Sequence, residues 1–325
     1  VQEAKDMTRY AFNLSESLGL PVILRTTTRI NHASGVVSLG LLMQRNDAGV
    51  FRKDPFSYVC IPSVSRNLRP ILLKKAAKAA HIANESRWNF IEGRGSFGIV
   101  CNGASFGYVA DAIAQSGYTD RFKVLRLGFS YPVPEDRIIR FLKGCEKVLV
   151  VEEGEPYLEE AVRVVAQRNG FGAAIFGKDE RLLSRLYEFD PAIVRNAISG
   201  VFDLPFAPAA PIATEDLPVA PPRPPNLCAG CPHRAAYLAV RDVFGEEAIY
   251  PTDIGCYTLG LHPPLNMGDF LIAMGAGAGS AGGFARATGK KVVAFIGDST
   301  FFHSGLSPLA SAVYNRHDFL LVILD

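Results

Sequence analysis

The sequence has few cysteines, no long apolar run and no marked excess of charge of either sign. Six cysteines in 325 residues are too few for a scaffold held by disulfides. No apolar stretch reaches the roughly 18 residues that a membrane-spanning helix needs, and no signal peptide is visible. The net charge is +2 and no basic tract is present, which argues against nucleic acid and anionic membranes as partners. These absences predict a cytoplasmic globular protein.

Helix-like and strand-like segments alternate between about residues 71 and 200. Apolar runs predict strands at 97–103, 122–128 and 147–154. Helical patterns predict helices at 70–86, 105–117, 134–144 and 157–170. Such β-α-β alternation indicates an α/β fold with parallel, doubly wound sheets flanked by helices. Before this region we expect a helix at 3–18, a strand at 21–29 and a connecting segment at 36–70.

A proline-rich stretch divides the chain. Residues 205–225 contain eight prolines, and proline both fixes φ and removes a backbone donor, so an extended linker is predicted. A further α/β unit begins at residue 226. Because the chain starts at Val1 and stops at Asp325 inside an apolar run, we expect it to be a piece of a longer polypeptide.

An acid follows a buried strand in "VVAFIGDST". Ligands of parallel sheets bind beyond the carboxyl ends of the strands, where Asp298 is expected. Gly297 permits a sharp turn, and Ser299 and Thr300 offer hydroxyls and amides at a helix start, which attracts phosphate. A carboxylate beside phosphate oxygens suits Mg²⁺. The alternative is that Asp298 only caps the helix.

Small residues precede this strand in "MGAGAGSAGGFARATG", residues 274–289. Gly277, Gly279 and Gly282 fit the dinucleotide-binding pattern G-x-G-x-x-G, but that pattern should follow a convincing strand, and "FLIAM" is short. We interpret the stretch as a helix that packs closely on a neighbour or a ligand.

These residues resemble the diphosphate-binding motif of thiamine diphosphate enzymes. The resemblance rests on Met274-Gly275, the small-residue helix, "VVAFIGDS" and "LLVILD". It implies that Asp298 binds the Mg²⁺ of thiamine diphosphate and that Gly297, Ser299 and Thr300 contact the diphosphate. Ser299 stands where the family most often has glycine. The Asn that completes the motif would be expected just beyond Asp325.

Three cysteines form a second pattern. Cys228 and Cys231 lie in "NLCAGCPHR", and Cys256 lies in "YPTDIGCYTLG". Two cysteines one turn apart with a distant third suit zinc or an iron-sulfur cluster, and His233 could complete a zinc site. Unpaired core thiols are the alternative. Cys60, Cys101 and Cys145 stand alone, and we expect each to be a small buried residue.

The cysteine pattern resembles the 2-oxoacid:ferredoxin oxidoreductases, in which a C-x₂-C and a later Gly-Cys supply ligands to a [4Fe-4S] cluster. Within that superfamily, "CAGCPHR", "YPTDIGCYTLG" and "VVAFIGDSTFFHSG" look like the alpha-subunit family of indolepyruvate ferredoxin oxidoreductases. Pro-His-Arg after Cys231 departs from the pyruvate enzymes, where glycine is usual. The resemblance covers nearly the whole chain. It implies the end of a pyrimidine-binding domain at 1–35, a transketolase C-terminal-like domain with its connecting segment at 36–204, and the first half of the diphosphate-binding domain at 226–325.

The resemblance also implies an activity. The full protein would oxidatively decarboxylate an aryl 2-oxoacid such as indolepyruvate, transfer the acyl group to coenzyme A and pass electrons to ferredoxin, with a beta subunit as partner. Asp253, Gly255 and Gly275 would line the cofactor site, and His303 is the candidate catalytic residue, with a structural role as its alternative. Two other functions stay open: a thiamine diphosphate-dependent lyase or synthase without electron transfer, and an inactive fragment of a larger assembly.

Two further groups have a structural interpretation. Arg29 and His32 follow a predicted strand end and could approach substrate, but a solvated loop is favoured. Glu152, Glu153 and Glu155 form an acidic cluster at a strand-to-helix turn, where capping is the expected role.

Overall fold

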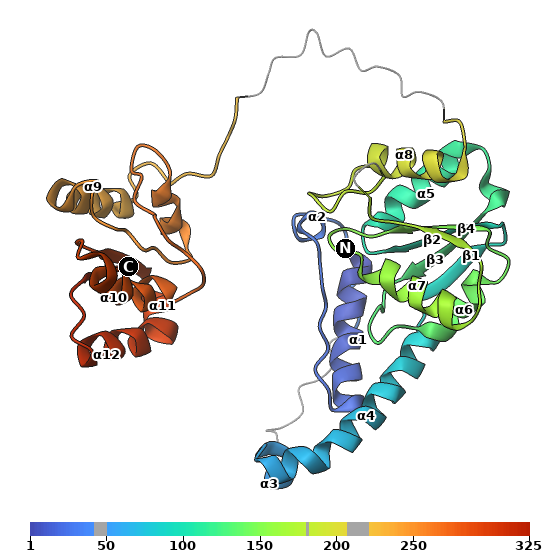
Figure 1. The fold of residues 1–325 in the computed structure, drawn as a ribbon, viewed down its shortest axis with the longest axis horizontal. Coiled ribbons are helices and arrows are strands. Elements are labelled where there is room, and N and C mark those ends of the chain that lie inside the picture. Colours follow the sequence, from blue (N-terminus) through green and yellow to red (C-terminus); the bar gives the residue numbers. More distant parts are fainter. Residues whose placement is uncertain (42–50, 180–181, 207–220) are drawn as a thin grey trace. The chain divides into compact units, whose positions relative to one another are not determined.

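The computed structural model describes residues 1–41, 51–179, 182–206 and 221–325. The chain divides into two compact units, Val1–Pro211 and Ile212–Asp325. Each unit combines β-strands with covering helices (Figure 1). The predicted α/β class is therefore confirmed. Most of the linker predicted at 205–225 falls on residues 207–220, which lie outside the described residues.

The first unit is built on a five-stranded sheet of order β1-β3-β2-β4-β5. Its strands are β1 (Asn89–Gly93), β2 (Phe97–Asn102), β3 (Phe122–Leu127), β4 (Lys147–Val151) and β5 (Ala174–Phe176). Strands β2 to β5 are parallel, whereas β1 runs antiparallel to β3 at one edge. The sheet is thus mixed, with a parallel centre where the sequence predicted one.

Helices cover both faces of this sheet (Figure 1). One face packs on α5 (Ser105–Ser116) and α8 (Pro191–Phe202), and the other packs on α6 (Glu135–Leu142) and α7 (Tyr157–Arg168). Successive side chains of β2 point to opposite faces of the sheet and so contribute to both hydrophobic cores. Ile99 and Cys101 face α5 and α8, whereas Val100 faces α6 and α7. Burial on both faces explains why β2 and β4 appear in the sequence as nearly continuous apolar runs, whereas β3 carries Lys123 and Arg126 at partly exposed positions.

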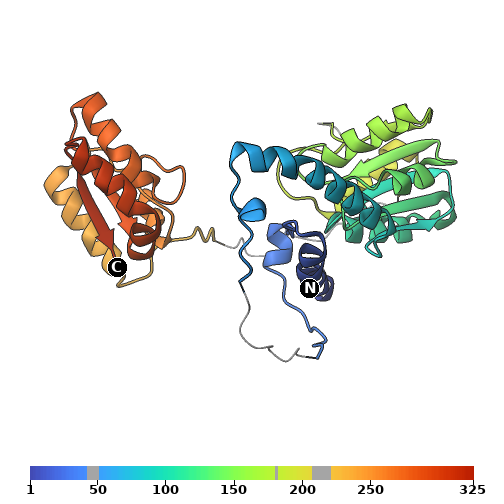
Figure 2. The same cartoon turned by 90° about the horizontal axis from the view of Figure 1, so that it is seen from below.

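A helical layer lies beside the sheet. α1 (Gln2–Leu18) packs on the long α4 (Pro62–Glu85) through Leu14, Leu18 and Ala79, as the two views of Figures 1 and 2 agree. α4 begins eight residues before the helix that the sequence predicted. The remaining short helices of the unit are α2 (Thr28–Asn31), α3 (Pro55–Tyr58) and the 3₁₀ turn Thr119–Arg121.

The strand predicted at 21–29 is wrong. Residues 21–27 have no regular structure, and α2 follows them. Within the part of the chain that the structure describes, no strand pairs with this stretch, and an apolar run forms a strand only when a neighbour takes up its backbone hydrogen bonds.

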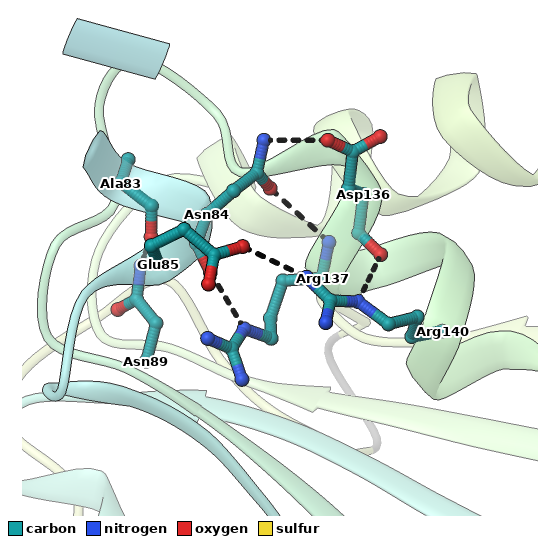
Figure 3. A network of polar contacts seen from close by, with 7 residues as sticks. All are labelled: Ala83, Asn84, Glu85, Asn89, Asp136, Arg137 and Arg140. Atoms are coloured by element: carbon teal, nitrogen blue, oxygen red, sulfur yellow. Dashed lines mark hydrogen bonds and ion pairs between the residues drawn. The ribbon is translucent and has the colours of Figure 1, made fainter. Parts of the chain in front are cut away.

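The end of α4 is tied to α6 by a buried amide (Figure 3). Asn84 donates to the Asp136 carboxylate at 3.0 Å and accepts from the Arg137 amide at 3.2 Å. Asn89, at the start of β1, donates to the Ala83 carbonyl at 2.8 Å. These bonds fix where α4 stops and where the sheet begins.

The second unit is built on β6 (Val293–Gly297) and β7 (Leu320–Leu324), which are parallel. Residues 249–251 extend this sheet on the other side of β6, because the Val293 amide donates to Ile249 and the Phe295 amide donates to Pro251, each at 3.0 Å. α9 (Pro232–Phe244) packs on one face, with the Tyr237 ring 4.4 Å from that of Phe295. α10 (Ala276–Thr288) packs on the other face through Ala281.

A continuous helical segment follows β6. It consists of α11 (Asp298–Thr300), a π-helical turn (Phe301–Gly305) and α12 (Leu306–Tyr314). A 3₁₀ turn, Cys256–Leu261, follows the strand-like residues 249–252. Among the described residues, no helix is long and apolar enough to cross a bilayer.

Candidate functional site

The carboxyl edge of the second unit's sheet carries two aspartates. Residues 249–252 and β6 run side by side in the same direction, so Asp253 and Asp298 follow neighbouring strand ends. This edge is where ligands of parallel α/β sheets bind. The structure therefore places both acids at the part of the sheet that the sequence singled out.

Asp298 opens the helical segment after β6. Gly297 occupies the N-cap position and no side chain caps this helix end, so Asp298 is not the N-cap. Asp298 and Ser299 are exposed, whereas Thr300 is buried. A solvent-facing carboxylate beside the first amides of a helical segment can hold a cation that also binds an anion.

The Tyr257 ring packs against two loops at this edge of the sheet, at Gly255 and at Gly297. A Cβ added to Gly297 would come within 2.7 Å of the ring, and a Cβ added to Gly255 would overlap it. The Tyr257 hydroxyl donates to the Ile254 carbonyl at 3.1 Å, and burial raises the pKa of this phenol above its ordinary value. Glycine is required at both positions because the ring fills the space of a side chain.

Asp253 points into the protein and is fully buried. Its carboxylate accepts hydrogen bonds from the amides of Gly275 at 2.7 Å, Gly277 at 3.4 Å and Ile254 at 2.8 Å. Asp253 thus accepts hydrogen bonds from the free backbone amides at the N-terminus of α10. Gly275 itself has φ of 86°, a left-handed conformation that favours glycine.

His303 lies on the π-helical turn and is exposed. Its Nδ1 is 2.6 Å from the Ser304 hydroxyl. Ser304 rests on Gly275, since a Cβ added there would come within 2.8 Å of the Ser304 Cβ. Short insertions of π-helix recur at functional sites. Contacts among these residues therefore join the loop after residue 252, the start of α10 and the segment after β6 at one edge.

The three cysteines are not assembled into a metal site. Cys231 is the N-cap of α9 and packs on the core near Tyr257, Cys228 is exposed, and the Cys231 amide donates to the Cys228 carbonyl at 3.2 Å. Cys256 is exposed on the next loop. Across the described ranges, no three His, Cys, Asp or Glu side chains lie close enough together to hold a metal ion.

His233 is the remaining candidate ligand of that region. Its Nδ1 is buried and has no hydrogen-bond partner among the residues that the structure describes, and its ring lies 6.2 Å from that of Tyr257. Of the isolated cysteines, Cys101 is buried as expected, whereas Cys145 is only half-buried. Cys60 is exposed, because it lies in the short stretch between α3 and α4 rather than in a core.

The acidic cluster of the first unit has a structural role. Glu152 is buried and accepts from the Leu158 and Glu159 amides at 2.8 and 2.9 Å, which stabilises the start of α7. Burial raises the pKa of Glu152. Glu153 accepts from the Phe189 amide, and Glu155 pairs with Arg185.

Arg29 and His32 also lie in the first unit. Arg29 pairs with Glu188 at 3.4 Å and lies 5.7 Å from the centre of the Tyr108 ring. His32 is exposed at the end of α2. Both residues are at the surface of this unit, in keeping with a solvated segment.

The fold and this edge define the class of protein. Residues 253–325 match the family of thiamine pyrophosphate enzymes at its C-terminal TPP binding domain. Residues 253–325 therefore belong to a thiamine pyrophosphate-binding domain, and the predicted α/β fold is confirmed.

The relatives are more specific. Over 334 residues the chain is 44% identical to the indolepyruvate oxidoreductase subunit IorA of Methanothermobacter thermautotrophicus, with 100% of this chain and 53% of that protein covered. It is also 44% identical to the IorA of Pyrococcus abyssi over 354 residues, with 100% and 54% covered. The chain is thus a homologue of the IorA subunits, as its motifs predicted, and it spans about half the length of these relatives.

A solved structure of a 2-oxoglutarate:ferredoxin oxidoreductase from Magnetococcus marinus matches 43% of this chain and 24% of its own. The sequence identity is 16% and the TM-score is 0.33.

Proposed function

We propose that the whole protein oxidatively decarboxylates aryl 2-oxoacids, indolepyruvate among them. The 2-oxoacid and coenzyme A would give the acyl-CoA and CO₂, and the two electrons released would pass to ferredoxin. The observation that carries this proposal is the 44% identity, over the full chain, to a protein named as an indolepyruvate oxidoreductase subunit. Because that relative is named as a subunit, a beta subunit is the expected partner. A cytoplasmic location belongs to the same proposal.

Thiamine diphosphate with Mg²⁺ is the proposed cofactor. The structure offers a fit: Asp298 is exposed at the amide end of a helical segment and does not cap it. Asp298 would bind Mg²⁺, and Gly297, Ser299 and Thr300 would contact the diphosphate, since carboxylate and phosphate oxygens are the ligands that Mg²⁺ prefers. When bound, the cofactor supplies a ring that stabilises a carbanion at the decarboxylated carbon. His303 would face the substrate, and Gly255 would approach the cofactor with its backbone.

A [4Fe-4S] cluster held by Cys228, Cys231 and Cys256 is a separate proposal. In the described part of the chain, these three thiols are not close enough together to bind one metal centre. The cysteines of 228–231 and of 256 would have to approach each other before a cluster could bind, so no reaction step is derived from them. Iron and sulfide analysis of the anaerobically purified whole protein and of a Cys256→Ser variant tests this; equal iron in both removes Cys256 from the ligand set.

The domain assignment is also proposed. Residues 1–35 would end a pyrimidine-binding domain, 36–204 would form a transketolase C-terminal-like domain, 205–225 a linker and 226–325 the first half of the diphosphate-binding domain. The parallel centre of the first unit's sheet and the homology over the whole chain support this assignment.

The activity is tested with the whole protein and its partner subunit under anaerobic conditions. Indolepyruvate, coenzyme A and an oxidised low-potential dye should give acyl-CoA and reduced dye, with one acyl-CoA formed for every two electrons that the dye accepts. Decarboxylation without dye reduction would instead support a thiamine-dependent lyase or synthase. Residues 1–325 alone should be inactive, and turnover by them would refute the requirement for the rest of the protein.

A further inference from the structure

Asp253 is a buried carboxylate whose recorded hydrogen-bond partners are all backbone amides. None of its surface is exposed. Burying such a charge is unfavourable unless hydrogen bonds replace its water. Here two amides at the start of α10 and the Ile254 amide do so. Two of its three hydrogen bonds therefore tie the carboxylate to the amides at the start of α10.

That helix end supports the turn that carries His303. The amide that Asp253 holds at 2.7 Å belongs to Gly275. Gly275 touches Ser304 so closely that an added Cβ would come within 2.8 Å of the Ser304 Cβ and 3.0 Å of its carbonyl oxygen. The Ser304 hydroxyl in turn meets His303 Nδ1 at 2.6 Å. A contact path thus runs from Asp253 through Gly275 and Ser304 to His303.

The path ends on a segment that needs support. Residues 301–305 are π-helical, between the α-helical α11 and α12. A π-helical turn is rare and depends on packing for its stability. The packing of Ser304 on Gly275 supplies such support, and Asp253 fixes the position of Gly275.

We infer that Asp253 is a positioning residue that sets the orientation of His303 through Gly275 and Ser304. It does not itself contact the reacting groups, because its carboxylate is buried and turned toward the α10 amides. The catalytic meaning of this inference rests on the proposed function, but the coupling between Asp253 and the π-helical turn does not. The inference also separates the two acids of this edge: Asp298 is open to a ligand, whereas Asp253 is used by the fold.

The coupling is tested in the whole protein with Asp253→Asn, which keeps the shape but loses the charge and turns an NH₂ toward amide donors. Amide hydrogen exchange at Gly275, Gly277 and residues 301–305 should accelerate at least about tenfold, since a hydrogen bond to a charged group contributes that much or more. The matched control is Asp269→Asn, because Asp269 also accepts an amide bond, from Tyr250 at 2.8 Å, away from this path. The control should leave exchange at 301–305 unchanged.

A second variant tests the last step of the path, between Ser304 and His303, if Asp253→Asn does not fold. Ser304→Ala removes only the hydroxyl that meets His303, so the imidazole resonances of His303 should shift. In both variants kcat should fall while the KM for the 2-oxoacid stays the same, because a misoriented catalytic group slows turnover without weakening substrate binding.

Two results would overturn the inference: exchange at 301–305 that is unchanged in folded Asp253→Asn, or a His303 resonance that is unchanged in Ser304→Ala. Absence of thiamine diphosphate binding by the wild-type protein would instead defeat the proposed function and leave the exchange result standing.

Discussion

Replacing Gly277 by alanine should push α10 away from the sheet on which it packs and destabilise the second unit. A Cβ on Gly277 would lie 2.9 Å from the Thr252 carbonyl oxygen and 3.2 Å from the Phe295 carbonyl oxygen. Both neighbours are backbone atoms in adjacent strand segments, so neither can rotate away as a side chain would. The helix has to shift, and with it the Gly275 turn at the carboxyl edge.

The expected loss follows from two opposing effects. Overpacking of a tight core contact costs about 1–3 kcal/mol. Alanine is the better helix former by up to about 1 kcal/mol. The net expectation is a destabilisation of up to about 2 kcal/mol. Gly283→Ala, in the same helix, meets nothing within 4 Å and should instead stabilise by roughly 0.5–1 kcal/mol.

Native-state hydrogen exchange at the β6 amides of Val293 and Phe295 measures the difference locally. These amides donate to Ile249 and Pro251, so their opening reports the stability of the second unit. The two variants should differ by about 2 kcal/mol, or about thirtyfold in protection. Equal protection in Gly277→Ala and Gly283→Ala would refute the close packing of α10 on the sheet.

Three further predictions concern pH, thiol chemistry and cofactor retention. Burial raises the pKa of Glu152 above 4.5, so the stability that its protonated form contributes is complete below pH 4.5 and is lost as the pH rises through the raised pKa. Urea titrations followed by the fluorescence of the single tryptophan, Trp88, should show this loss in the wild type but not in Glu152→Gln. Parallel pH profiles of the two proteins would contradict this expectation. Burial also raises the pKa of Cys101 to about 12, so iodoacetamide at pH 8 should alkylate the exposed Cys60 and spare Cys101, and modification of Cys101 in native protein would show that its burial is wrong. Chelation of divalent cations should release thiamine diphosphate from the whole protein, and retention after exhaustive dialysis with a chelator would argue against a metal-bridged diphosphate.

The sequence predicted those strands and helices whose own residues show a clear pattern of buried apolar side chains. The strands β2 and β4 were visible because a strand covered on both faces needs a nearly continuous apolar run, and β3 was visible because four of its six residues are apolar and buried. The edge strand β1 was missed, since "NFIEG" is partly exposed and mixes polar with apolar residues. The apolar stretch at 21–24 predicted a strand that does not form, because pairing depends on a neighbour that local sequence does not specify.

The same distinction holds at the candidate site. Gly297 and Asp298 were found because a strand, a glycine and an acid are adjacent in the sequence. Tyr257 was missed, since its role depends on Gly297, 40 residues later along the chain. Ser304 was missed for the same reason, because its partner Gly275 lies 29 residues earlier. Asp253 was expected to line the cofactor site, and no sequence pattern reveals that its carboxylate turns toward the amides of α10.

The central claim is that Asp298 holds the metal and diphosphate of the cofactor, and calorimetric titration of the whole protein with thiamine diphosphate and Mg²⁺ tests it most directly. Asp298→Ala should weaken binding by about a hundredfold or more, equivalent to roughly 2.7 kcal/mol. Asp318→Ala, which removes an exposed acid just before β7, should bind as the wild type does. Undiminished affinity in Asp298→Ala would contradict the claim.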